Sequence, residues 1–134
     1  MRLACEDRLD ILELIARYGH YADEGYYERL GELFSVDAVF DATDMGLPLA
    51  EGLAAITSLW KKRELNPLAH HATNVVISEV DSQTANVLSK GIGVGYRGRV
   101  GSVTYRDVVR REREGWRFVR RVATLRRSEE SSTK

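Results

Sequence analysis

The chain has little cysteine and no long apolar run, and each shortage excludes a class of protein. Its 134 residues include one cysteine, Cys5, so no internal disulfide and no cysteine-based metal site can form. No apolar run approaches the roughly 18 residues that a membrane-spanning helix needs. Glu6 and Asp7 come too early for the apolar core of a signal peptide. We therefore expect a cytoplasmic chain with no membrane partner.

Net charge is zero, but the charges are unevenly distributed. Residues 1–60 hold 12 acidic and 4 basic side chains, whereas residues 97–127 hold 11 arginines and 3 acids. Such asymmetry can mark a nucleic-acid-binding protein. The arginines alternate with valines and aromatic residues, however, which is typical of strands with one solvated face. We therefore expect no nucleic-acid partner and keep an arginine-based nucleic-acid binder only as a rival hypothesis.

The first half of the chain has the apolar spacing of helices. Residues 7–25 predict a long helix that Asp7 caps and Gly25 ends, with a buried face of Leu9, Leu12, Ile15, Tyr18 and Ala22. Residues 26–34 predict a second, short helix. A third is predicted over 52–65, ending before Asn66-Pro67.

The remainder has the pattern of strands. A first strand is predicted over 36–44, and four more over 70–80, 84–98, 99–112 and 116–127. The polar tail 128–134 is predicted to be disordered. The sequence thus predicts one α+β domain over residues 1–127, with helices first and a mostly antiparallel sheet after them.

Residues 93–98, GVGYRG, match the G-x-G-x-x-G pattern of dinucleotide-binding proteins. That pattern binds a pyrophosphate only where the glycines lead from a strand into a helix. Here strands lie on both sides, so we expect no nucleotide. Gly91, Gly93 and Gly95 share one strand face, which indicates a sharp bend or a close approach by another segment.

Two of the three histidines, His70 and His71, are adjacent in a predicted strand. Neighbouring strand residues point to opposite faces, so the two cannot share a metal, and we expect no metal site. The alternation places His71 on one face with Thr73, Val75 and Ile77. Because that face is largely apolar, we expect it to be the outer face of the sheet and to hold a homodimer together, with the glycine face helping close approach.

A single histidine can still act as a general acid or base if a carboxylate orients its ring. Asp23 is the candidate, because it ends an apolar helix face at the electronegative end of the helix, where an acid is disfavoured by a few tenths of a kcal/mol. The alternatives are a solvated acid beside Glu24 and a histidine that only caps a strand. We expect the Asp23 and His70 side chains to meet.

Four segments resemble a known family in their order and spacing. They are RYGHYADEGYYERLGELFSVDAVFD, EGLAAI, HHATN and YRDVVRREREGWRFVRR. Together they resemble the SnoaL-like branch of the nuclear transport factor 2-like superfamily over about residues 6–127, the branch that includes scytalone dehydratase. The resemblance implies a cone-shaped fold in which three N-terminal helices pack on a strongly curved, mostly antiparallel sheet.

The resemblance also implies site residues. Asp23 and His70 match the family's catalytic pair, and Tyr18 matches a pocket position that holds Tyr or Lys. A recurring late-sheet arginine corresponds to Arg110 or Arg121. The full set of substrate-binding candidates is Asn74, Trp60, Arg110, Arg121 and His71. The chain departs from scytalone dehydratase where Ser89 or Lys90, and Ala42, replace a histidine or tyrosine, so that enzyme's substrate is not implied.

The function that these residues favour is a cofactor-free lyase or isomerase of the dehydratase type. His70 would remove a proton next to a carbonyl, and the partner would be a small hydrophobic or polycyclic carbonyl compound. One rival is a polyketide-type cyclase or an epoxide hydrolase, which a carboxylate-rich pocket would favour, for instance Asp41, Asp44 and Asp107 converging with Asp23. Another is a ligand-binding domain without catalysis.

Overall fold

A computed structural model describes residues 3–62 and 67–128 of the chain. Two α-helices and three short 3₁₀ helices accompany six strands in the described residues. The helices are α1 (Cys5–Glu24), η1 (Tyr27–Glu32), η2 (Thr43–Met45), α2 (Leu53–Lys62) and η3 (Tyr96–Gly98). The strands are β1 (Phe34–Asp41), β2 (Ala50–Glu51), β3 (Ala69–Glu79), β4 (Thr84–Val94), β5 (Val100–Glu112) and β6 (Gly115–Leu125).

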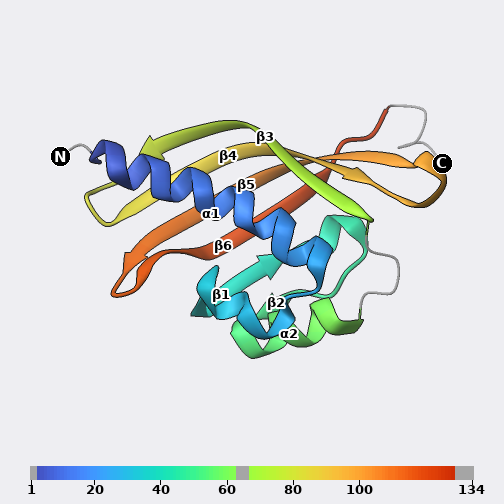
Figure 1. Cartoon of the computed structure of the whole chain (residues 1–134), viewed down its shortest axis with the longest axis horizontal. Coiled ribbons are helices and arrows are strands. Elements are labelled where there is room, and N and C mark those ends of the chain that lie inside the picture. The colour runs from blue at the N-terminus through green and yellow to red at the C-terminus, as the bar shows by residue number, and fades with distance from the viewer. Residues whose placement is uncertain (1–2, 63–66, 129–134) are drawn as a thin grey trace.

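All six strands form one sheet in the order β2-β1-β6-β5-β4-β3. Only the β1–β6 pairing is parallel, and the other pairings are antiparallel. The helix α1 lies across one face of the long strands, while α2 lies beside β1 and β2 (Figure 1). The α+β class and the mostly antiparallel sheet predicted from the sequence are confirmed. We call the sheet face that α1 covers the inner face.

The boundaries of several elements differ from those predicted. The second helix is the 3₁₀ segment η1, and Phe34, which was expected at its end, begins β1. The third helix is α2, for which residues 63–66 of the predicted span lie outside the described residues. The predicted polar tail also lies outside them, except for Ser128. In the described ranges, no helix is both long enough and apolar enough to cross a bilayer.

The buried face of α1 differs in part from the predicted one. Ile15, Tyr18 and Ala22 are buried as expected, but Leu9 and Leu12 are 61% and 41% exposed. The residues Ile11 and Leu14 take their place. Leu9 precedes Tyr18 by nine residues, which is about two and a half turns, so it points to the opposite side of the helix.

A bulge in β3 changes which residues share a face. The pairing with β4 shifts between Thr73 and Val76, and Asn74 has a φ of 56°. Beyond the bulge, Val75 and Ile77 pack against the core. The predicted common face of His71, Thr73, Val75 and Ile77 is therefore wrong, because one extra residue exchanges the two faces.

The outer face of β3 and β4 has exposed apolar residues of its own, namely Val76, Leu88 and Ile92. Dimerisation through this face stays a prediction, and sedimentation at micromolar protein concentration would test it.

The glycines of β4 serve contacts within the chain. A Cβ on Gly91 would overlap the Tyr105 ring and lie 2.9 Å from Val103 Cγ2, and a Cβ on Gly93 would lie 3.0 Å from Pro67 Cγ. The close approach predicted for these glycines is made by side chains of the same chain, and a role of this face in a dimer stays a prediction. Strands flank GVGYRG as predicted, with β4 before it and β5 beginning at Val100, but β4 ends at Val94 and the short η3 lies between them.

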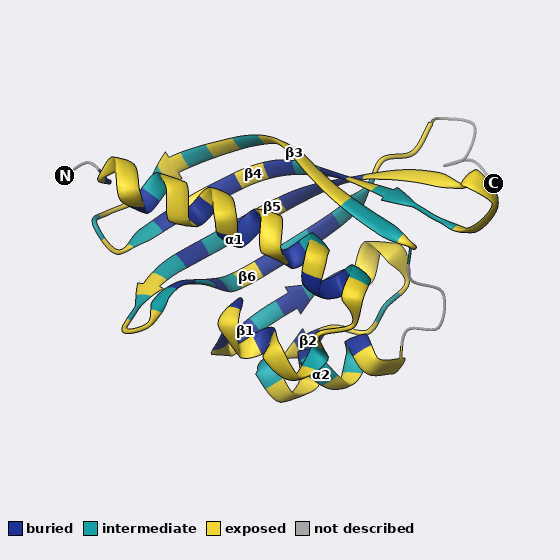
Figure 2. Ribbon diagram, viewed as in Figure 1, coloured by how far each residue is buried: buried dark blue, intermediate teal, exposed yellow. Residues whose placement is uncertain are grey.

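The core lies between α1 and the inner face of the sheet (Figure 2). Aromatic side chains from four elements meet there, mostly edge to face, and they are Tyr18, Phe34, Phe40, Trp60 and Phe118. Of the predicted site residues, Tyr18 and Trp60 belong to this aromatic cluster, and His70 contacts it through Tyr18.

Candidate active site

The structure brings Asp23 and His70 together. Asp23 lies in the last turn of α1, and His70 is the second residue of β3. The Asp23 carboxylate accepts the His70 backbone N–H at 3.0 Å and 3.1 Å, and its Oδ1 lies 2.6 Å from His70 Nδ1. Their side chains are only 20% and 13% exposed. Two contacts to the backbone and one to the imidazole thus hold His70 at the junction of helix and sheet.

Gly19 allows this junction to form. A Cβ at Gly19 would lie 3.0 Å from the His70 carbonyl oxygen, so a side chain there would push α1 away from β3. Gly25, with a φ of 72°, ends the helix just after Asp23. Gly19 was not among the site residues predicted from the sequence. A glycine inside a helix is disfavoured by about 1 kcal/mol relative to alanine and so indicates a packing requirement, which is the signal that could have found it.

The contact with Asp23 determines the tautomer of His70. A carboxylate only accepts hydrogen bonds, so Nδ1 carries the proton and donates to Asp23 Oδ1. When the ring is neutral, the other nitrogen, Nε2, has a lone pair available. An imidazole in this state can accept a proton from a bound molecule.

Tyr18 links His70 to the interior of the domain. Its ring meets that of His70 edge to face, with the centroids 6.4 Å apart. It also meets the rings of Trp60 at 5.1 Å and Tyr105 at 5.7 Å. Two of the predicted site residues, Tyr18 and Trp60, are therefore in direct contact with each other, and Tyr18 also contacts His70.

Arg121 is the late-sheet arginine that reaches the interior. Its side chain and that of Asp107 are both 0% exposed, and Nε lies 3.2 Å from Asp107 Oδ1 without the angles of a hydrogen bond. The guanidinium carbon lies 3.7 Å from the ring centroid of Tyr105 and 4.0 Å from that of Tyr18. Burial raises the pKa of Asp107 to about 6, although the positive charge of Arg121 acts in the opposite direction.

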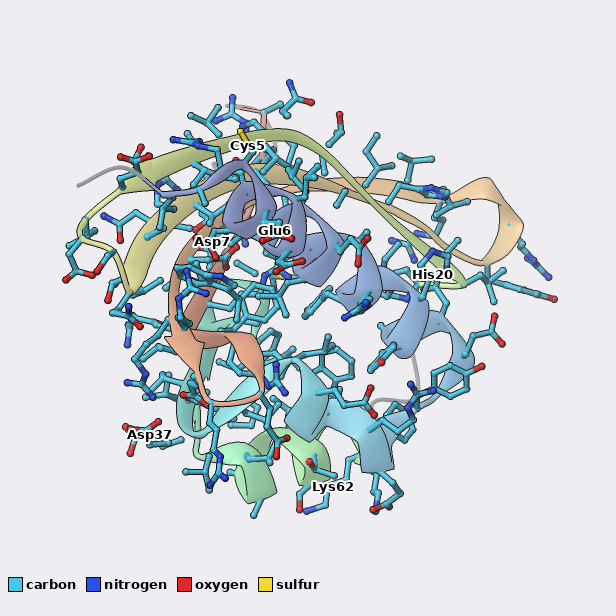
Figure 3. The ribbon with its side chains drawn as sticks, turned by 60° about the vertical axis from the view of Figure 1, so that its left-hand side comes forward. Cys5, Glu6, Asp7, His20, Asp37 and Lys62 are labelled. Carbon is cyan, nitrogen blue, oxygen red and sulfur yellow. The ribbon has the colours of Figure 1, made fainter. Side chains whose placement is uncertain are left out.

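Arg110 lies elsewhere. Its side chain pairs with Glu112 at 2.6 Å and with Asp37 at 3.3 Å, at the surface (Figure 3 labels Asp37). In β5, Arg110 follows the inward-facing Val109, so its side chain points to the outer face of the sheet. Arg121 faces inward because the pairing of β6 shifts where Val109 pairs with Phe118, which leaves one extra residue in β6.

Asn74 and His71 are both exposed. Asn74 sits in the β3 bulge and accepts a hydrogen bond from Thr73 Oγ1 at 2.8 Å. His71 precedes the bulge and points to the face opposite His70. The structure does not bring either residue together with Asp23 and His70. The third histidine, His20, is exposed on α1 (Figure 3).

The acids expected to converge with Asp23 are engaged elsewhere. Asp41 accepts from Thr43 at 2.7 Å, and Asp44 accepts from Arg127 at 2.8 Å. Asp41 and Asp44 therefore do not join Asp23 in the kind of acidic pocket that would favour a cyclase or hydrolase. No group of three or more His, Cys, Asp or Glu side chains that could hold a metal is found in the part of the chain that the structure describes.

Solved structures share this fold over nearly the whole chain. A nuclear transport factor 2-like protein with a cystatin-like fold from Novosphingobium aromaticivorans is 31% identical, with 96% of this chain and 87% of that chain covered and a TM-score of 0.78. A candidate scytalone dehydratase from the same organism is 22% identical, with 90% and 84% covered and a TM-score of 0.73.

A type 2 hexachlorocyclohexane dehydrochlorinase is 17% identical, with 90% of this chain and 85% of that chain covered and a TM-score of 0.73. No curated protein matches the chain in sequence.

Fold and site together define an α+β domain of the nuclear transport factor 2-like kind, in which one helix covers a curved sheet. Within that class, the SnoaL-like domain family matches residues 4–122. The chain belongs to the SnoaL-like domain family.

Proposed function

We propose that the chain is a small-molecule lyase or isomerase of the dehydratase type, with His70 as the general base. The observation that carries this proposal is the 2.6 Å contact between Asp23 Oδ1 and His70 Nδ1, which leaves Nε2 to accept a proton. Asp23 keeps the ring in this orientation and stabilises the imidazolium that forms. The reaction needs no cofactor.

In the proposed reaction, Nε2 takes a proton from a carbon next to a carbonyl group. The electron pair of that C–H bond moves onto the carbonyl oxygen, giving an enolate. Tyr18, beside the His70 ring, donates a hydrogen bond to this oxygen. Expulsion of a leaving group from the next carbon completes an elimination, and return of the proton to another carbon completes an isomerisation.

The comparisons support an elimination. Two of the similar structures are named for elimination enzymes, the candidate scytalone dehydratase and the hexachlorocyclohexane dehydrochlorinase. Tyr18 beside His70, together with the Trp60 and Tyr105 rings that contact Tyr18, favours a hydrophobic or polycyclic carbonyl compound as the substrate.

The experiment begins with a panel of hydroxy-ketones and enones, followed by ultraviolet absorbance. On a substrate that turns over, His70→Ala should lower kcat/KM by at least about 10²-fold. Since the two residues act as a unit, His70→Ala combined with Asp23→Asn should be little worse than His70→Ala alone. Full activity of His70→Ala would exclude the mechanism.

The rival hypothesis of a ligand-binding domain without catalysis makes a different prediction. A compound of the panel would bind saturably, but its absorbance would stay constant in the presence of the wild-type protein. An active wild-type protein and an inactive His70→Ala protein that still binds the compound would exclude this rival.

A further inference from the structure

The inner face of the sheet holds a second polar cluster, separated from His70 by Tyr18. Asp107 on β5 and Arg121 on β6 are directly opposite each other. Ser89 on β4 lies diagonally from Asp107, because its neighbour on the same face, Val87, is the residue that pairs with Asp107. Three adjacent strands thus each contribute one buried polar side chain.

These side chains have more hydrogen-bonding groups than partners. Arg121 Nη1 and Nη2, both Asp107 oxygens and the Ser89 hydroxyl have no hydrogen-bond partner among the described residues. The indole N–H of Trp60 on α2 is in the same state. Buried polar groups are nearly always hydrogen-bonded, because each one left unpaired costs about 1–3 kcal/mol. The unpaired groups of Asp107, Arg121 and Ser89, which lie beyond Tyr18 from His70, indicate a ligand.

The chemistry of the donors indicates which ligand. A guanidinium binds oxyanions through its in-plane N–H groups, often two at a time. The ring centroids of Tyr18, Tyr105 and Phe118 lie 4.0, 3.7 and 4.6 Å from the guanidinium carbon. The nearest charged partner is Asp107, on the Nε side. The two Nη groups therefore remain to bind a small oxyanion such as a carboxylate or an enolate oxygen.

We propose that Arg121 and Asp107 form a binding site for one small oxyanion of the substrate or product, and that Asp107 takes up one proton when this anion binds. The proposal rests on the proposed function only for the identity of the anion.

Charge balance is the reason for the proton. With Asp107 ionised, the pair is neutral, and a second anion beside it would be repelled strongly in a site that excludes water. With Asp107 protonated, the site carries one positive charge, since an arginine does not lose its proton. An arriving anion thus favours the protonated form of Asp107, whose pKa burial already raises to about 6.

The surroundings contain few other groups that could take this proton. Arg121 faces Asp107 from β6, while β4 contributes only the uncharged Val87 and Ser89. The side of α1 that faces the sheet carries two acids, Asp7 and Asp23, and each already binds a partner on the sheet. Tyr18 and Tyr105 cover the guanidinium, and His70 lies behind Tyr18. His70 is therefore the competing proton acceptor that an experiment must separate from Asp107.

The test uses the full chain, with formate and acetate as probes and titration calorimetry as the measurement. Titrations at about pH 7 in two buffers with different ionisation enthalpies give the number of protons bound with each anion. We expect uptake of one proton. The affinity should fall about tenfold for each pH unit above the pKa of Asp107, because one proton is linked to binding. Absence of saturable binding of either anion, or binding without proton uptake, overturns the proposal.

Three variants show which residue takes up the proton and where the anion binds. His70→Ala should still bind the anion with proton uptake, and loss of the uptake in this variant would place the proton on His70 and overturn the proposal. The double variant Asp107→Leu with Arg121→Met replaces the pair by apolar side chains, a change that proteins often tolerate. It should lose anion binding, whereas Arg110→Gln at the surface should keep it.

If the double variant does not fold, the number of protons that the wild-type protein takes up with each anion still tests the proposal. If it folds and binds formate as tightly as the wild-type protein does, the proposal is wrong. None of these measurements requires turnover. A failed anion site would therefore leave the role of His70 standing, and an inactive panel would leave the anion site standing.

Discussion

The helix α1 is attached to the sheet by an aspartate near each end, and the two aspartates have different partners. Asp7, near the first turn (Figure 3), accepts the indole N–H of Trp116 at 3.2 Å and lies 2.5 Å from Arg111. Asp23, in the last turn, holds His70. Both residues are aspartates of the same helix, and both lie against the sheet. Their expected roles differ because their partners differ.

The partners of Asp7 keep their protons at neutral pH, and the partner of Asp23 is a side chain that commonly exchanges one. Asp7 also lies at the helix end where an acid is favoured, whereas Asp23 lies at the end where it is disfavoured. The hydrogen bond from Trp116 and the charge of Arg111 lower the pKa of Asp7. Asp7 therefore stabilises the packing of the helix. Asp23 lies in a locally unfavourable position, which is typical of a functional residue.

The largest expected effect is a loss of turnover when Asp23, but not Asp7, is replaced by asparagine. Asp23→Asn should lower kcat/KM by at least about 10²-fold, because the amide cannot stabilise the imidazolium. Asp7→Asn should leave the turnover of folded protein unchanged and lower the melting temperature, because it removes the charge that faces Arg111. Turnover on the identified substrate and circular dichroism measure the two effects. Equal losses of turnover in both variants would mean that Asp23 also acts only through stability.

A smaller loss of turnover is expected from a substitution at Gly19. It tests whether the Asp23 end of α1 acts by positioning His70 and not only by stabilising the fold. Helix propensity alone predicts that Gly19→Ala stabilises α1 by about 1 kcal/mol. The added Cβ would lie 3.0 Å from the His70 carbonyl oxygen, however, and would shift the helix relative to β3. Misplacement of a catalytic group by about 1 Å can cost up to about 10²-fold in rate.

We therefore expect Gly19→Ala to lower turnover even where it does not lower the melting temperature. Ala16→Gly, on the exposed side of the same helix, is the matched control and should lower stability without lowering turnover. Unchanged turnover in Gly19→Ala would show that the junction tolerates a wider gap.

The contact between Asp23 and His70 could be expected from the sequence, because each residue is poorly explained alone and the order of the elements resembles a family with such a pair. The α+β class followed from the change in apolar period near His70. The change of period is a property of local sequence, which carries such information well. The contact joins residues 47 positions apart, so the resemblance was needed to expect it.

The arrangement of the inner face could not be predicted, because two bulges decide it. The shift after Thr73 in β3 places Val75 inside, and the shift at Val109 in the β5–β6 pairing places Arg121 inside in place of its neighbours. A bulge adds one residue and exchanges the two faces of the strand beyond it. No alternating pattern in the sequence reveals that residue, so Arg110 and Arg121 remained equivalent candidates and the pairing of Asp107 with Arg121 was not foreseen.

The smallest expected effect again concerns Asp7 and is measured as a dependence of stability on pH. Its carboxyl has a pKa below the ordinary 3.8 in the folded chain. A lowered pKa means that the unfolded chain binds the proton more readily, so this carboxylate stabilises the fold above about pH 4 and loses that effect as the pH falls through its folded pKa.

The urea midpoint of the wild-type protein should therefore exceed that of Asp7→Asn at pH 7, and the difference should shrink by about pH 3. Other carboxyl groups titrate in both proteins, so the difference between the two midpoints isolates Asp7. A difference that stays constant over this range would mean that Asp7 contributes through the shape of its side chain and not through its charge. The packing of the N-terminal end of α1 would then depend on the fit of Trp116 and Arg111 around that side chain.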